Sequence, residues 1–134
     1  MTHDEFVQKH FPEVGPGREP LGNKITVQLM SVQKKSQGGI LLAESTKDFN
    51  KQATTVARVI KLGRIAYKDR NSGDTWKEGA WCDVGDLVLV HRYGGLNRVE
   101  IPLGTDEAVI FCTYNDYDVL DKITGHYEVY SQVL

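Results

Sequence analysis

Residues 83–95 read DVGDLVLVHRYGG, an apolar run enclosed by two turn sequences. Val84-Gly85-Asp86 on one side and Tyr93-Gly94-Gly95 on the other carry the glycines typical of tight turns. Residues 87–90 are apolar at every position, which predicts a short central strand that is covered on both faces. The stretch therefore favours a fold of short β-strands linked by turns.

Two other segments show the alternation of half-exposed strands. In residues 23–29, Ile25, Val27 and Leu29 alternate with polar side chains, which predicts a half-buried strand. Residues 126–133 predict a final edge strand with Tyr127, Val129 and Val133 on one face and Tyr130 on the other. Further strands are expected at residues 56–62, 98–101 and 108–113. Together these patterns predict an all-β protein, a small barrel or sandwich.

Residues 64–82 predict a hairpin that turns at the sequence KDRNSGD. Trp76 and Trp81 are expected to pack within this hairpin or against a neighbouring subunit. A platform for stacking nucleic-acid bases would need basic partners, and only Lys77 is close in sequence.

The N-terminal segment has a different pattern. Thr2 and Glu5 have the spacing of a helix capping box, and Pro12 would end the resulting helix over residues 1–12. A frayed tail is the alternative interpretation. Residues 12–20 hold three prolines and two glycines and predict a linker.

Residues 33–55 interrupt the strand pattern. They are rich in Lys, Gln, Ser and Thr, except for the apolar Ile40-Leu41-Leu42, which follows the hinge Gly38-Gly39. A connection of this length is usually functional or disordered. Two interpretations stay open: the three apolar side chains fold back onto the barrel, or they form a recognition segment that orders when it meets a groove.

The composition argues against several function classes. The chain has 134 residues and a net charge of −2, so it lacks the basic excess typical of nucleic-acid binding. It has no P-loop, no Gly-x-Gly-x-x-Gly and no Gly-x-Ser-x-Gly motif, so neither nucleotide binding nor an enzyme is indicated. Without a signal-peptide pattern or a long apolar run, we expect a soluble cytoplasmic protein that does not contact membranes.

The candidate metal ligands Cys82, His91 and Cys112 are isolated rather than paired, so no metal site is expected. The two cysteines are expected to be buried or half-buried thiols in a reducing compartment, with a disulfide left open. His91 is expected to be either a surface histidine or one whose hydrogen bonds are satisfied. Asp116 and Asp118 are expected to be solvated turn residues rather than a general acid and base.

Taken in order, these landmarks resemble the GroES-type co-chaperonin family over residues 20–123. The opening PLGNKITV is similar to the family's first strand, SQGGILL to its mobile loop, and DVGDLVL to its Val-Gly-Asp turn and strand. The other similar segments are residues 59–64, 93–99, 106–110 and 116–120.

The resemblance implies a small irregular GroES-like β-barrel with a long mobile loop over residues 33–55 and a roof hairpin over residues 64–82. Copies would assemble into a homo-oligomeric ring, in this family a heptamer. Residues 1–19 would then be an N-terminal extension and linker, and residues 124–134 a C-terminal extension.

The implied function is that of a co-chaperonin, which caps a GroEL-type chaperonin in an ATP-dependent manner and encloses its folding chamber. The chaperonin binds the ATP, and this chain needs no cofactor. By the resemblance, the chaperonin-binding residues are Gly38, Gly39, Ile40, Leu41 and Leu42. The subunit interface would contain Ile25, Val27, Val119 and Leu120, and the roof hairpin Tyr67, Trp76 and Trp81.

The sequence also departs from the family pattern. Arg58 stands where the family has a glycine, the hairpin is longer, and the two extensions have no counterpart. Such drift is similar to that of a virus-encoded co-chaperonin. The alternatives are a small barrel that binds single-stranded nucleic acid and a structural virion protein. GroES-like barrels also occur as the catalytic half of zinc alcohol dehydrogenases. That enzyme interpretation would need metal ligands and a dinucleotide domain, and this sequence indicates neither.

Overall fold

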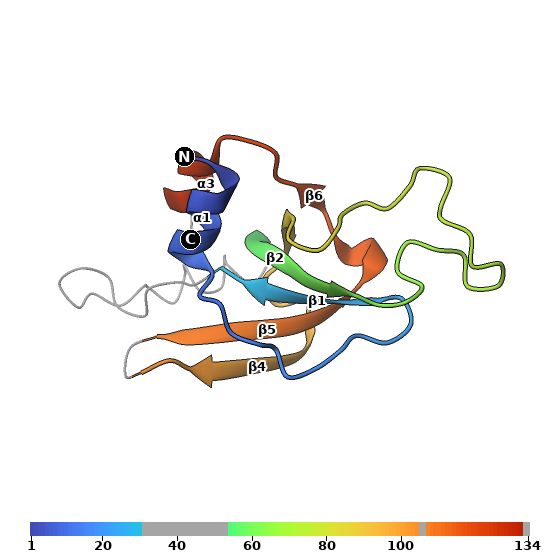
Figure 1. Ribbon diagram of the computed structural model, residues 1–134, viewed down its shortest axis with the longest axis horizontal. Coiled ribbons are helices and arrows are strands. Elements are labelled where there is room, and N and C mark those ends of the chain that lie inside the picture. The colour runs from blue at the N-terminus through green and yellow to red at the C-terminus, as the bar shows by residue number, and fades with distance from the viewer. Residues whose placement is uncertain (31–53, 105–106, 133–134) are drawn as a thin grey trace.

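The computed structural model describes residues 1–30, 54–104 and 107–132. In this part of the chain, one antiparallel six-stranded sheet has the order β4-β5-β1-β2-β3-β6 (Figure 1). The strands are β1 (Lys24–Leu29), β2 (Thr54–Leu62), β3 (Leu87–His91), β4 (Leu96–Pro102), β5 (Ala108–Asn115) and β6 (Asp121–Lys122). The helices are α1 (His3–His10), the 3-10 turn η1 (Asp116–Asp118) and α3 (Tyr127–Gln132). The prediction of a mostly β fold is confirmed.

Strand β3 has the environment that its unbroken apolar sequence predicts. Val88 and Val90 belong to a first core on one face of the sheet, while Leu87 belongs to a second core on the other. Gly85, in the turn before the strand, has a φ of 93°, a conformation that costs glycine little. The predicted tight turn and the doubly covered strand are therefore both confirmed.

Strand β1 is buried on both faces, so the prediction of a half-buried strand is wrong. Ile25, Val27 and Leu29 lie in the first core, but Thr26 and Gln28 on the opposite face are also almost completely buried. The predicted linker covers that face: the Gln28 amide donates to the carbonyl of Pro12 at 3.1 Å. Farther along, Arg18 donates to the carbonyl of Asn97 in β4 at 2.7 Å, and the segment crosses the sheet in Figure 1. The linker is thus part of the packed structure.

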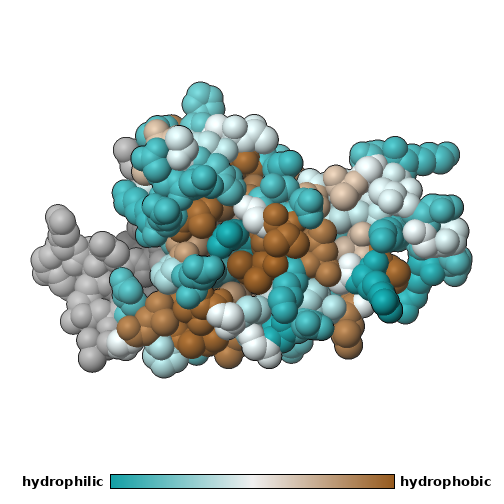
Figure 2. All heavy atoms as spheres, in the orientation of Figure 1, coloured by the Kyte–Doolittle hydropathy of each residue, from teal (hydrophilic) through white to brown (hydrophobic). Residues whose placement is uncertain are grey.

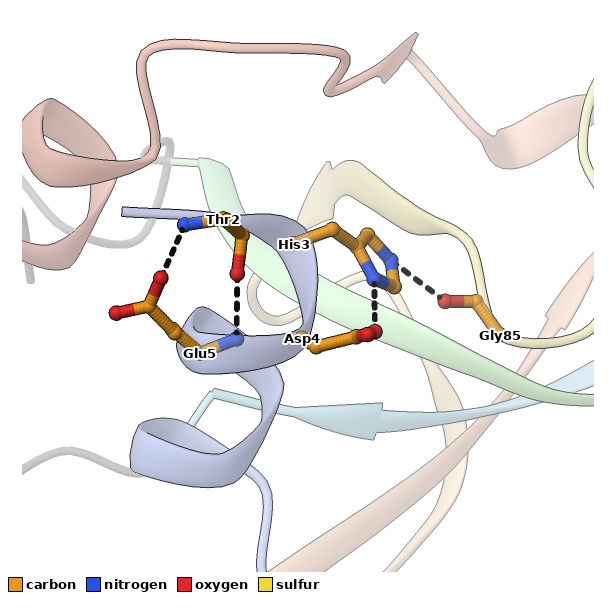
Figure 3. Close-up of polar contacts among 5 residues, drawn as sticks. All are labelled: Thr2, His3, Asp4, Glu5 and Gly85. Carbon is orange, nitrogen blue, oxygen red and sulfur yellow. Dashed lines mark hydrogen bonds and ion pairs between the residues drawn. The ribbon is translucent and has the colours of Figure 1, made fainter.

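The first eight-residue helix, α1, forms as its capping box predicts. The Thr2 hydroxyl accepts from the backbone N–H of Glu5 at 3.2 Å, and the Glu5 carboxylate accepts from the backbone N–H of Thr2 at 3.1 Å (Figure 3). Phe6 is buried completely, so this segment is docked rather than frayed.

Residues 127–132 form the helix α3, so the predicted edge strand is wrong. Tyr127 and Tyr130 are three residues apart and share one helical face, which packs against the second core. Val129, placed with Tyr127 by the strand pattern, is instead 57% exposed. None of the described helices has the length and apolar character needed to cross a bilayer.

The hairpin of residues 64–82 is paired more sparsely than predicted. Its only described bridge joins Lys68 to Thr75, and turns make up most of the rest. The Asp69 carboxylate accepts from the backbone N–H groups of Asn71 and Ser72 at 2.8 and 3.0 Å, which stabilises the predicted reversal. The tip extends away from the sheet, and its surface is mostly hydrophilic (Figures 1 and 2).

Candidate functional site

The roof-hairpin residues Tyr67, Trp76 and Trp81 form one aromatic cluster. Ring centroids lie 5.3 Å apart for Tyr67–Trp76, 5.8 Å for Tyr67–Trp81 and 5.3 Å for Trp76–Trp81. The sequence predicts that the tryptophans pack within the hairpin or against a neighbouring subunit, and the structure shows packing within the hairpin. The cluster adds to the few backbone hydrogen bonds of the hairpin, such as that from the Trp76 N–H to the Tyr67 carbonyl at 3.0 Å, since edge-to-face rings stabilise beyond the area they bury.

Tyr67 anchors this cluster to the first core. It is fully buried with a φ of 59°, and its hydroxyl lies 3.3 Å from Sγ of Cys82. Burial, together with this hydrogen bond, raises the pKa of Tyr67 far above its ordinary value. The ring therefore stays neutral and acts as a structural group.

Asp116 is buried, so the prediction that it is a solvated turn residue is wrong. Its carboxylate accepts from the backbone N–H of Tyr67 at 2.9 Å and from the Asn23 amide at 3.2 Å. It thereby joins the hairpin to the residues that precede β1. The three-residue spacing of Asn115 and Asp118, which form a capping box around it, is the sequence signal that could have indicated this.

Replacing Asp116 with alanine is expected to lower the free energy of unfolding by about 3 kcal/mol, because it removes a charge-assisted acceptor and leaves the Tyr67 N–H buried without a partner. Urea denaturation measures this loss. The matched control is Asp121→Ala in β6, an exposed position where a change within about 0.5 kcal/mol is expected. Equal effects of the two substitutions would contradict the anchoring role.

The predicted interface residues divide into two groups. Ile25 and Val27 are 0% exposed, and β1 is paired on both edges by β2 and β5 of its own chain. These two side chains are therefore covered by their own chain, and their assignment to a subunit interface stays a prediction. Val119 is buried, whereas Leu120 is 43% exposed and lies beside the edge strand β6.

Leu120 belongs to an apolar patch at the edge of the sheet. Tyr117, 59% exposed, adds to it, and a shallow cavity of about 320 Å³ opens here. The cavity is lined by Trp81, Tyr117, Val119, Leu120, Asp121 and Lys122. The patch thus extends from Trp81 of the hairpin cluster to the edge strand β6.

The predicted chaperonin-binding residues Gly38, Gly39, Ile40, Leu41 and Leu42 lie outside the described residues. The structure does show the strand ends that flank them. The backbone N–H of Met30 donates to the carbonyl of Val56 at 2.9 Å, which we call the Met30–Val56 hydrogen bond. Strand β2 already begins at Thr54, so residues 54 and 55, assigned to the loop by the sequence, belong to the strand.

Cys82 and Cys112 are free buried thiols, as one of the two sequence interpretations predicts, and burial raises the pKa of both. His91 is exposed, as predicted. Within residues 1–30, 54–104 and 107–132, no three His, Cys, Asp or Glu side chains are grouped closely enough to hold a metal ion.

The partly buried imidazole of His10 is expected to make the stability of the protein depend on pH. Its Nε2 lies 2.7 Å from the Ser131 hydroxyl, and burial, followed by the charge of Lys9, lowers the pKa of its imidazole. Because the folded-state pKa lies below the unfolded value of about 6.5, this contribution is complete above that pH and is lost as the pH falls through the lowered pKa.

We therefore expect the melting temperature to fall more steeply below about pH 6.5 in the unmodified chain than in His10→Gln. Gln keeps a hydrogen-bond donor for Ser131 and does not titrate. Thermal unfolding at several pH values between 5 and 8 measures the difference. Parallel curves for the two proteins would show that His10 does not carry the dependence.

One comparison with known proteins bears on the whole sheet. Residues 18–123 match the family model described as Cpn10, the chaperonin 10 Kd subunit. The match includes every described strand, the hairpin and the apolar patch, whereas α1 and α3 lie outside it. It covers most of the chain and agrees with the landmarks that the sequence shares with the GroES type. The chain therefore belongs to the chaperonin 10 Kd subunit family, the GroES-type co-chaperonins.

Proposed function

We propose that this co-chaperonin caps a GroEL-type chaperonin in an ATP-dependent manner and encloses its folding chamber. The observation that carries the proposal is the family match over residues 18–123, which spans both the sheet and the segment 31–53 that joins β1 to β2. In this proposal the partner binds the ATP, and this chain contributes only binding surfaces.

The segment Ile40-Leu41-Leu42 binds an apolar groove of the chaperonin in this proposal. Burying three such side chains contributes roughly 5–8 kcal/mol before ordering costs. Ordering about ten residues offsets most of that gain, so one segment binds weakly. Several segments presented by one ring bind tightly through their effective concentration, and they still release one at a time.

The ring, which we propose to be a heptamer, needs a surface that one copy offers to the next. The apolar patch around Leu120 and Tyr117 supports this role, because both side chains are exposed beside an edge strand. The opposite edge strand, β4, has the exposed Leu96. A head-to-tail contact between unlike surfaces is the kind that closes a ring.

The test is to mix the purified protein with a GroEL-type chaperonin, with and without ATP, and to examine the products by electron microscopy and sedimentation. We expect capped complexes with ATP and few without it. Absence of capping under both conditions would refute the proposal. Salt-sensitive capture of a single-stranded oligonucleotide in place of capping would favour the nucleic-acid alternative.

A further inference from the structure

The helices α1 and α3 lie outside the family match and pack together at one end of the sheet (Figure 1). They cover the second core, whose buried members are Phe6, Phe11, Met30, Val56, Leu87 and Ile123. Tyr127 and Tyr130 of α3 pack against the same core. Both ends of the chain therefore share one apolar cluster with the sheet.

This cluster includes the base of the segment 31–53. Met30 is the last described residue before that segment, and Val56 lies near the start of β2, the strand that follows it. Both side chains are almost completely buried. They also form the Met30–Val56 hydrogen bond, which closes the base of the segment. The side chains of the helices thus share one core with the two residues that bring β1 and β2 together at this end.

Polar contacts at each end of α1 hold it in this position. Nε2 of His3 donates to the carbonyl of Gly85, in the turn before β3, at 3.0 Å (Figure 3). At the other end, Nε2 of His10 contacts the Ser131 hydroxyl of α3. Between them, the ring of Phe6 lies 6.1 Å from those of Phe11 and Tyr127. Helix α1 is therefore fixed to the sheet and to α3 at once.

We infer that α1 and α3 form a clasp that keeps the Met30–Val56 hydrogen bond formed. The clasp thereby fixes the two strand ends from which the chaperonin-binding segment leaves the sheet. The effect on binding rests on the proposed function. Fixed strand ends reduce the conformational freedom that the segment loses on binding, and preorganisation of this kind raises affinity. The closed hydrogen bond itself does not depend on any partner.

The experiment compares the full-length protein with Phe6→Ala, which removes the buried ring, and with Val129→Ala, a matched control on the exposed face of α3. Native-state hydrogen exchange reports the opening of the Met30 amide. We expect exchange at Met30 to be at least about tenfold faster in Phe6→Ala, with amides in the centre of β5 much less affected. Val129→Ala is expected to match the unmodified protein. If Phe6→Ala does not fold, Tyr130→Ala makes the same comparison.

Chaperonin binding in the presence of ATP is measured on the same proteins. We expect about tenfold weaker binding for the Phe6 variant and none of this loss for the control. Unchanged exchange at Met30, exchange that rises equally at all amides, or faster Met30 exchange with unchanged binding would each overturn the inference. If even the unmodified protein formed no complex, the proposed function would fail, and the exchange data alone would decide whether the clasp exists.

Discussion

Leu41→Asp is expected to abolish the capped complex. The substitution removes one of three apolar side chains, worth about 1.5–3 kcal/mol when buried, and places a charge where the proposal has an apolar groove. The first term alone weakens each segment by about tenfold to a hundredfold. Because every subunit of a ring would carry the same change, these losses multiply across the complex. Electron microscopy and sedimentation with chaperonin and ATP measure the outcome.

The control for charge is Thr46→Asp, which adds the same carboxylate to the polar part of residues 33–55. It is expected to leave capping intact. The melting temperature of Leu41→Asp separates the two interpretations that the sequence leaves open. An unchanged value agrees with a recognition segment, whereas a marked decrease would show that Leu41 packs onto its own subunit. Capping that survives Leu41→Asp would refute the assignment of this segment.

Gly63→Ala is expected to destabilise the protein by about 3 kcal/mol or more, the upper end of the range for overpacked sites. A Cβ at this position would lie 2.3 Å from the carbonyl oxygen of Gly22 and 2.6 Å from that of Lys24. Both obstacles are backbone atoms, so no side-chain rotation can relieve the clash. The clash also disrupts the hydrogen bond that the Gly63 N–H donates to Lys24 at 2.8 Å.

For a chain of this size, such a loss corresponds to a decrease in melting temperature of about 10 °C. Gly15→Ala is the matched control, because a Cβ there would meet nothing within 4 Å. It is expected to leave the melting temperature unchanged or slightly higher, since alanine restricts the unfolded chain more than glycine does. A small effect of Gly63→Ala would mean that β2 and the turn before β1 can separate at little cost.

Sequence patterns were reliable where one segment determines its own structure. The capping box of Thr2 and Glu5 places both partners within one helical turn, so it needs no other part of the chain. The turn at Gly85 and the apolar run after it similarly predict a strand with a defined start. Residues 126–133, where the sequence predicts an edge strand, were harder, because so short a stretch does not separate alternation from helical spacing. The second core, built partly from Phe6, selected the helix.

The candidate site divides in the same way. Tyr67, Trp76 and Trp81 are close in sequence, and the structure confirms that they lie together in the hairpin. Ile25 and Val27 were assigned to an interface by resemblance, but the partners that bury them come from β2 and β5. The importance of Asp116 was missed because its donor, the Tyr67 N–H, is 49 residues away.

The sequence alone determined the mostly β fold, the turns and the first helix, since backbone hydrogen bonding and side-chain periodicity act over a few residues. The family was indicated separately, by the resemblance of landmarks in the same order along residues 20–123. Only the tertiary structure decided which polar side chains are buried, as Gln28 is beneath Pro12, and which apolar ones stay exposed, as Leu120 does. Burial depends on the distant segment that covers a residue, and no local pattern specifies that segment. The second core is an example, because it brings side chains of α1 and α3 together with Met30 and Val56, which are far from both helices in the sequence.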